Sequence, residues 1–348
     1  MNTRPSFFKL DELDERNAHD IEMTMRITRR RFIGAGGAAV SVALAGCAAP
    51  PSATRPTGAP TSTTGSAPLV VALDEFAGLS VLSLGVKPAQ VFITFDYASA
   101  KAVFNAAGVP MLPAAPNGVN LEAVSAQKPA IIMGVSLPTT VSVKDKLEAI
   151  APTTVIEYTA SWQDQLKITG ATLGRSEAAD LLIKRLEATV NSLKSDLAGA
   201  GVAGKTVSVI GALGNDTFAL SRTGVVGSII EQVGLKRPAV QDVATEATDP
   251  FIAISAERIN DHDADWIFLL SGGQYKADAL TASPIWKTLK AVRANKVVNV
   301  VAELWFSSNA FGVDWILRDL RAALLGSGAV ATEADVVSRW QAFTSAQN

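Results

Sequence analysis

The chain of 348 residues carries 31 basic and 33 acidic residues, a formal net charge of −2. This balance argues against nucleic acid as a partner, because a nucleic-acid-binding surface is strongly basic. A single cysteine, Cys47, excludes an intramolecular disulfide.

The first 46 residues have the features of an export signal. Three arginines at 29–31 precede an uncharged stretch at 32–45. A membrane-spanning helix needs about 20 apolar residues, so this shorter stretch fits the hydrophobic region of a signal peptide. Residues 28–33, Thr-Arg-Arg-Arg-Phe-Ile, resemble the twin-arginine export signal. The acidic segment before Met25 is unusual for a signal peptide, so we expect synthesis to start at Met25.

Cys47 ends the segment Leu44-Ala45-Gly46-Cys47, which resembles the lipobox of bacterial lipoproteins. The resemblance implies that its thiol receives a diacylglycerol and that residues 1–46 are removed. Stable attachment to a membrane needs more than one lipid chain, as lipoproteins have. Residues 48–67 are almost wholly Ala, Pro, Ser, Thr and Gly, so we expect residues 47–67 to form a flexible, lipidated tether. These features predict a protein anchored by lipid on the extracytoplasmic face of the cell membrane.

The remaining mature chain has little with which to ligate a bare metal. Without the 7 basic and 6 acidic residues of the leader, it has 24 basic and 27 acidic residues, a net charge of −3. His262 is then its only histidine. This excludes a multi-histidine site for a bare transition metal.

Residues 68–161 alternate short β-rich runs with helical stretches, which predicts an α/β lobe with a largely parallel sheet. We expect strands at 69–73, 91–95 and 130–134 and helices at 76–84 and 98–107.

Residues 162–200 are predicted to form a helical spine. One helix should span 162–173 and end at Gly174, and a second should be capped by Ser176 and run to about Leu197. At ~1.5 Å per residue, the second helix would be ~33 Å long, the width of a small domain. Its apolar residues recur at helical spacing: Leu182, Leu186, Val190, Leu193 and Leu197.

The alternation of strands and helices restarts in residues 201–348, at 206–211, 225–233, 266–270 and 296–301. Two segments of the first half recur in the second in the same order: 80–88 matches 228–238, and 120–124 matches 255–259. We therefore predict two similar lobes, 68–161 and 201–348, joined by the spine.

Five segments in order resemble the solute-binding lipoproteins of ABC importers for ferric siderophores, cobalamin and haem, the class III periplasmic-binding-protein type. They are VVALDEF at 70–76, NLE at 120–122 with KPAII at 128–132, ITGATLG at 168–174, ISAE at 254–257 and PIWK at 284–287. The resemblance implies a clamp whose lobes close little, with a ligand cleft between them, and a monomer that delivers its ligand to an importer permease.

The resemblance also implies two docking residues for the permease, one on each lobe. The matching positions are Glu122 and Glu257, which also occupy equivalent points of the internal repeat. The alternative is that each glutamate simply stabilises a helix N-terminus.

The ligand is expected where loops leave the carboxyl ends of the strands. An arginine beside aromatic rings would suit a bulky anionic chelate. Phe76, Phe306 and Tyr158 follow strands too, although packing in the core explains them as well. The ligand-binding candidates are Glu75, Tyr97, Ser136 and Trp162 in the first lobe and spine, and Arg222, Tyr275 and Trp305 in the second lobe.

These features favour a binding protein for a ferric siderophore, with no cofactor and no enzymatic activity. Cobalamin stays open, as does haem with a tyrosine as axial ligand. An exported enzyme is disfavoured because the sequence has neither a Gly-x-Gly-x-x-Gly nor a Gly-x-Ser-x-Gly motif. A tethered sensor or scaffold is the third alternative.

Overall fold

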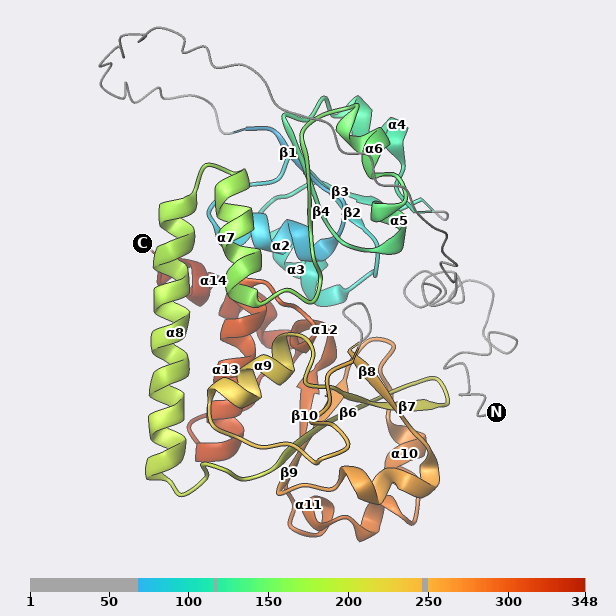
Figure 1. Cartoon of the computed structure of the whole chain (residues 1–348), viewed down its shortest axis with the longest axis vertical. Coiled ribbons are helices and arrows are strands. Elements are labelled where there is room, and N and C mark those ends of the chain that lie inside the picture. The colour runs from blue at the N-terminus through green and yellow to red at the C-terminus, as the bar shows by residue number, and fades with distance from the viewer. Residues whose placement is uncertain (1–67, 116–117, 246–249, 348) are drawn as a thin grey trace, which may run out of the picture.

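The computed structural model describes residues 68–115, 118–245 and 250–347. The export signal, the lipobox with Cys47 and the tether lie outside these ranges. Two lobes are stacked on one another, and one long helix, α8, runs along the side of both (Figure 1). This arrangement confirms the predicted α/β fold with two lobes and a connecting helix, whereas the exact boundaries at 161/162 and 200/201 stay predictions.

The first lobe contains a five-stranded sheet in which every pairing is parallel. Its strands are β1 (Val70–Ala72), β2 (Gln90–Ile93), β3 (Met111–Pro113), β4 (Ile131–Val135) and β5 (Thr153–Ile156), in the order β3-β2-β1-β4-β5. Its helices are α2 (Glu75–Ser83), α3 (Ala98–Ala106), α4 (Leu121–Ala126), α5 (Pro138–Val141) and α6 (Lys144–Glu148).

Asp74 shows how local sequence sets the packing of this lobe. It is the N-cap of α2, and its Oδ1 accepts the N–H of Ala77 at 2.8 Å. Its Oδ2 accepts the N–H of Val135 at 2.8 Å, at the end of β4. One buried carboxylate therefore satisfies the helix start and joins it to the neighbouring strand.

The spine consists of α7 (Trp162–Thr172) and α8 (Ser176–Gly199). The apolar stripe predicted for α8 is confirmed, since all five of its residues are buried. The predicted cap is wrong by one position, because Arg175 occupies the N-cap and makes no side-chain cap bond. Gly170 allows α7 and α8 to approach closely: a Cβ there would lie 2.5 Å from the Cβ of Ala179.

The second lobe has a mixed sheet in the order β10-β9-β6-β7-β8. Strands β6, β9 and β10 are parallel, while β7 runs antiparallel to both of its neighbours. The strands are β6 (Val207–Leu213), β7 (Asp216–Leu220), β8 (Phe251–Ile254), β9 (Trp266–Ser271) and β10 (Val297–Val301). The helices are α9 (Val225–Gln232), η1 (Ala256–His262), α10 (Asp278–Ala282), η2 (Trp286–Thr288), α11 (Lys290–Arg293), α12 (Ala302–Trp305), α13 (Ala310–Leu325), η3 (Glu333–Asp335) and α14 (Val336–Ser345).

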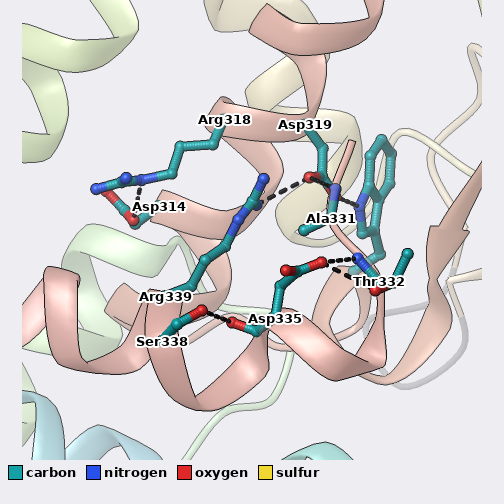
Figure 2. Close-up of polar contacts among 9 residues, drawn as sticks. Asp314, Arg318, Asp319, Ala331, Thr332, Asp335, Ser338 and Arg339 are labelled. Carbon is teal, nitrogen blue, oxygen red and sulfur yellow. Dashed lines mark hydrogen bonds and ion pairs between the residues drawn. The ribbon is translucent and has the colours of Figure 1, made fainter. Parts of the chain in front are cut away.

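Buried Asp319 of α13 joins the last helices of the chain (Figure 2). It accepts hydrogen bonds from Nε1 of Trp305, the N–H of Ala331 and Nη1 of Arg339. The helix that carries Arg339, α14, packs against α3 of the first lobe as well as α13. It is therefore a second connection between the lobes, beside the spine.

The largest hydrophobic core is continuous across both lobes. It includes Val70 of β1, Val207 of β6 and the buried stripe of α8. Two smaller clusters cover the outer faces, one around Ile132 of the first sheet and one around Ile267 of the second. Within the described residues, no helix is both long and apolar enough to span a bilayer.

Candidate functional site

Four aromatic rings of the first lobe gather at the carboxyl ends of its strands. The ring centroid of Phe76 lies 5.3 Å from that of Phe95 and 5.4 Å from that of Tyr158. Tyr97 stacks on Phe95 at 5.4 Å and meets Phe76 edge-on at 6.0 Å. Such offset and edge-to-face contacts stabilise aromatic clusters beyond the area that they bury.

Four rings of the second lobe face them. Phe306 is 5.2 Å from Tyr275 and 5.8 Å from Phe251, and Phe218 contacts all three. We call the two sets together the aromatic junction: Phe76, Phe95, Tyr97 and Tyr158 of the first lobe, and Phe218, Phe251, Tyr275 and Phe306 of the second.

Tyrosine hydroxyls connect the two sides of the aromatic junction. The hydroxyls of Tyr97 and Tyr275 lie 3.5 Å apart, and Tyr158 donates to the carbonyl of Phe306 at 3.4 Å. These are all three tyrosines of the sequence. Burial, the largest cause in each case, raises their pKa values, so at neutral pH the hydroxyls are uncharged hydrogen-bond donors.

Two carboxylates from different lobes hold the segment 94–99 that carries Tyr97. Glu75 accepts the N–H groups of Thr94 at 2.9 Å and Phe95 at 2.8 Å. Glu303 of α12 accepts the N–H groups of Ala98 and Ser99 across the lobe boundary. Because Tyr97 is the N-cap of α3 and makes no side-chain cap bond, Glu303 supplies the anion that this helix start favours.

Burial raises the pKa of Glu75 from 4.5 to about 7, and the bonds to backbone N–H groups only partly oppose this effect. Its carboxyl group is buried and fully engaged by the first lobe. The structure therefore places Glu75 as a support for the backbone segment that leads to Tyr97, and its predicted contact with a ligand stays a prediction.

Ser136 and Gln165 extend the polar contacts. Ser136 Oγ donates to Glu157 at 2.9 Å and accepts the N–H of Tyr158 at 3.0 Å, so it fixes the backbone beside the junction. Gln165 of α7 accepts from the hydroxyl of Ser308 at 2.9 Å, which joins the spine to the second lobe.

Both predicted tryptophans are in the core. Trp305 is 0% exposed; it stacks on Phe268 at 5.0 Å and donates to Asp319. Trp162 is 1% exposed, and its indole N–H has no acceptor among the described residues. Neither ring presents surface to a ligand in this conformation.

Arg222 follows β7, two positions after Leu220, which pairs with Phe251 of the aromatic junction. Its half-exposed guanidinium is 3.8 Å from Asp242. It follows β7, which runs antiparallel to β6, and so leaves the sheet at the end opposite to the segments that follow β9 and β10. Arg222 still follows the carboxyl end of its own strand, and its ligand-binding role stays a prediction.

His262 has a structural environment. Its Nδ1 lies 3.1 Å from Nε2 of Gln241, which also donates to Ser208. Burial lowers the pKa of His262 to about 4, so the ring is neutral. No group of three or more His, Cys, Asp or Glu side chains suited to a metal ion occurs in the ranges that the structure describes.

Glu122 and Glu257 are exposed and occupy equivalent places in the two lobes. Each lies in the first turn of a short helix, α4 or η1, that leads into a strand paired with the first strand of its lobe. This equivalence agrees with the internal repeat, while a docking role stays a prediction.

Sequence reasoning missed Glu303, Phe95, Phe218 and Phe251. Glu303 follows β10 directly, which was the available signal, but its partners lie more than 200 positions earlier in the chain. Phe218 and Phe251 belong to the antiparallel strands, which the sequence pattern did not reveal.

Comparison with known proteins gives consistent results. The sequence profile described as periplasmic binding protein matches residues 70–304. The probable siderophore-binding lipoprotein YfiY of Bacillus subtilis (strain 168) is 28% identical over 284 residues, covering 74% of this chain and 82% of YfiY.

Solved structures share the fold. Staphylococcus aureus SirA, complexed with staphyloferrin B, has a TM-score of 0.64 at 25% identity and covers 75% of this chain and 94% of SirA. FhuD2 of the same species, with bound ferrioxamine B, has a TM-score of 0.63 at 22% identity and covers 74% of this chain and 99% of FhuD2.

Proposed function

Because this chain belongs to the periplasmic binding protein family, we propose that it captures a ferric siderophore at the aromatic junction and delivers it to an ABC importer permease. Members of this family bind ligands and transfer them unchanged, so the chain is not an enzyme.

The aromatic junction is the observation that carries the proposal. A ferric siderophore is a bulky chelate with a largely organic surface, which aromatic rings can contact over a wide area. Buried, neutral tyrosine hydroxyls can donate to the oxygen atoms of such a chelate. The relatives named for siderophore binding support the same ligand class.

Binding requires the lobes to separate at this junction. Tyr97 and Tyr275 are 7% and 8% exposed, so their faces are covered in the present conformation. The continuous core, α8 and α14 oppose a wide opening. We propose a small movement that breaks the Tyr97–Tyr275 contact and admits the chelate between the two sets of rings.

Iron would arrive already chelated. No cofactor is needed for this role.

Intrinsic fluorescence tests the proposal, because the chain has 6 tryptophans. We expect saturable quenching by at least one ferric hydroxamate, catecholate or carboxylate siderophore, without turnover. If only cobalamin or only haem quenched the fluorescence, that compound and not a siderophore would be the ligand. If none of these compounds changed the fluorescence, the proposal would be refuted.

A lipid on Cys47 would keep the binding lobes close to the permease and raise their effective concentration there. Cys47→Ala should then release a soluble protein with unchanged ligand affinity, as fractionation of cells would show. A variant that remained in the membrane fraction would contradict this anchor.

A further inference from the structure

Glu303 lies between the two segments that carry Tyr97 and Tyr275. It belongs to α12 of the second lobe and is 4% exposed. Its Oε2 accepts both the N–H of Ser99 at 2.8 Å and the hydroxyl of Ser99 at 2.5 Å, and its Oε1 accepts the N–H of Ala98 at 3.3 Å. One buried carboxylate of the second lobe therefore holds the start of α3 in the first lobe.

The same carboxylate contacts the turn that presents Tyr275 in its own lobe. A Cβ placed at Gly273 would lie 3.1 Å from Oε1 of Glu303. The turn is tight, because the N–H of Tyr275 donates to the carbonyl of Gly272 at 3.0 Å and Gly273 has a φ of 56°. Glu303 thus touches the segments of both tyrosines, one in each lobe.

The bonds from Glu303 to α3 are stronger than the tyrosine contacts across the aromatic junction. The hydroxyls of Tyr97 and Tyr275 lie 3.5 Å apart, and Tyr158 donates to the carbonyl of Phe306 at 3.4 Å, both long for a hydrogen bond between oxygen atoms. Hydrogen bonds to a carboxylate are shorter and about twice as strong as those between neutral groups.

The start of α3 is also the counter-charge of Glu303. A helix N-terminus carries a partial positive charge, and Tyr97 at the N-cap makes no side-chain cap bond of its own. Among the described residues, no lysine, arginine or histidine pairs with Glu303. Moving α3 away would therefore leave this carboxylate without its partner.

We propose, on the basis of the binding function above, that Glu303 is a strap that holds the lobes closed in the ligand-free protein and is released when a chelate enters. Tyr97 directly precedes the two residues whose N–H groups Glu303 holds, so separating Tyr97 from Tyr275 draws the start of α3 away from α12. The strap competes with the ligand, because the apparent affinity of a site falls with the fraction of molecules in which that site is open.

Glu303→Gln should therefore raise the affinity for the ferric chelate that quenches the fluorescence, by about tenfold. The variant keeps the size of the side chain and loses the charge that the start of α3 favours, an interaction large enough to change the open fraction by this factor. Replacing a residue that only supports the structure, or that contacts the ligand, would weaken binding. A gain in affinity is therefore specific for a strap.

Ser99→Ala removes one of the three bonds and should raise the affinity about threefold. Combined with Glu303→Gln it should add less than its separate effect, because both changes act on the same contact. Ser307→Ala is the matched control. The hydroxyl of Ser307 is buried too, but it donates to the backbone carbonyl of Glu303 within the second lobe, so the affinity should stay within about twofold of the wild type.

The distance between the lobes can be measured without any ligand. Lys146 of α6 and Lys287 of η2 are exposed positions on the two lobes. Spin labels at Lys146→Cys and Lys287→Cys, in a Cys47→Ala chain that has no other cysteine, would report this distance by double electron–electron resonance. The chain with native Glu303 should give one distance, and Glu303→Gln should add a longer one.

The outcomes separate this inference from the function on which it rests. Identical distance distributions in the two ligand-free chains overturn the strap, even if chelates bind. Unchanged or weaker chelate binding by Glu303→Gln overturns its release on ligand entry. If no chelate binds to either chain, the proposed function fails, while a longer lobe distance in Glu303→Gln still supports the strap.

Discussion

At the scale of single residues, two adjacent buried carboxylates, Asp74 and Glu75, fix the backbone beside the aromatic junction. Each carboxylate is shielded from water and accepts hydrogen bonds from two backbone N–H groups instead. Asp74 thereby joins α2 to β4, and Glu75 holds the segment that carries Tyr97. Burial outweighs these hydrogen bonds and raises the pKa of Asp74 to about 6 and that of Glu75 to about 7. Both residues therefore make the stability of the fold sensitive to pH.

Glu75→Gln should reduce this pH dependence. The folded chain holds the proton of Glu75 more tightly than the unfolded chain, so its contribution to stability is complete below about pH 4.5 and is lost as the pH rises through about 7. For the wild type, the free energy of unfolding should fall between these values by on the order of 3 kcal/mol from Glu75 alone. Urea unfolding of wild type and variant from pH 4.5 to 8 would measure the difference.

Glu187→Gln, an exposed change on α8, should retain the wild-type pH profile. If Glu75→Gln kept the full pH dependence too, the raised pKa of Glu75 would not be its source.

Some site residues could be predicted from the sequence and others could not. Tyr97 and Tyr275 follow β-rich runs, and both lie in the aromatic junction. Trp305 also follows a strand, but an aromatic residue in that position packs into the core equally well, as this one does against Phe268. Glu303 acts on the N-terminus of α3, a contact between distant parts of the chain that no local pattern encodes.

At the scale of secondary-structure elements, helix α7 packs against α8, and Gly170 sets the distance between the two helices. The space for its missing side chain is occupied by Ala179 of α8 and the carbonyl of Arg175. The two helices connect the lobes, so the distance between the helices affects the relative position of the lobes.

Gly170→Ala should destabilise the protein by about 1–3 kcal/mol, because the added methyl group overpacks the helix contact. Urea unfolding would measure the loss, and Ala179→Gly in the same chain should recover part of it. Gly199→Ala is the matched control: open space surrounds that position, so the change should be neutral or stabilise by up to ~1 kcal/mol. Equal effects of the two substitutions would contradict a close helix contact.

Element prediction worked where the sequence pattern was long or strongly apolar. The stripe of α8 and the buried strand β4 are examples. The short strands β3 and β5 escaped notice because they have only three and four residues. None of those residues is buried in β3 and only one is buried in β5, so the sequence shows little periodicity there. The antiparallel β7 was missed because its hairpin with β6 interrupts the strand–helix alternation on which the parallel expectation rested.

At the scale of the whole molecule, both lobes share one hydrophobic core, and α8 and α14 connect the lobes at different places. This construction favours a small rearrangement at the aromatic junction over a wide hinge motion. It also keeps the two exposed glutamates of the repeat, Glu122 and Glu257, in a nearly fixed relation, as docking to a single permease would need.

Reversing both charges, Glu122→Arg with Glu257→Arg, should abolish uptake of the ferric chelate by cells while the ligand affinity of the purified protein stays unchanged. Radioactive iron uptake and fluorescence titration would measure the two effects separately. Glu187→Arg should leave uptake intact. Loss of ligand affinity in the double variant would place these glutamates in the binding site and contradict a docking role.

The most direct test of ligand binding at the aromatic junction is a calorimetric titration of the quenching ferric chelate into wild type and into Tyr97→Ala with Tyr275→Ala. The two rings contribute to both faces of the junction. We predict one site in the wild type and at least tenfold weaker binding in a variant whose circular dichroism is unchanged. Wild-type affinity in that folded variant would contradict the aromatic junction as the ligand site.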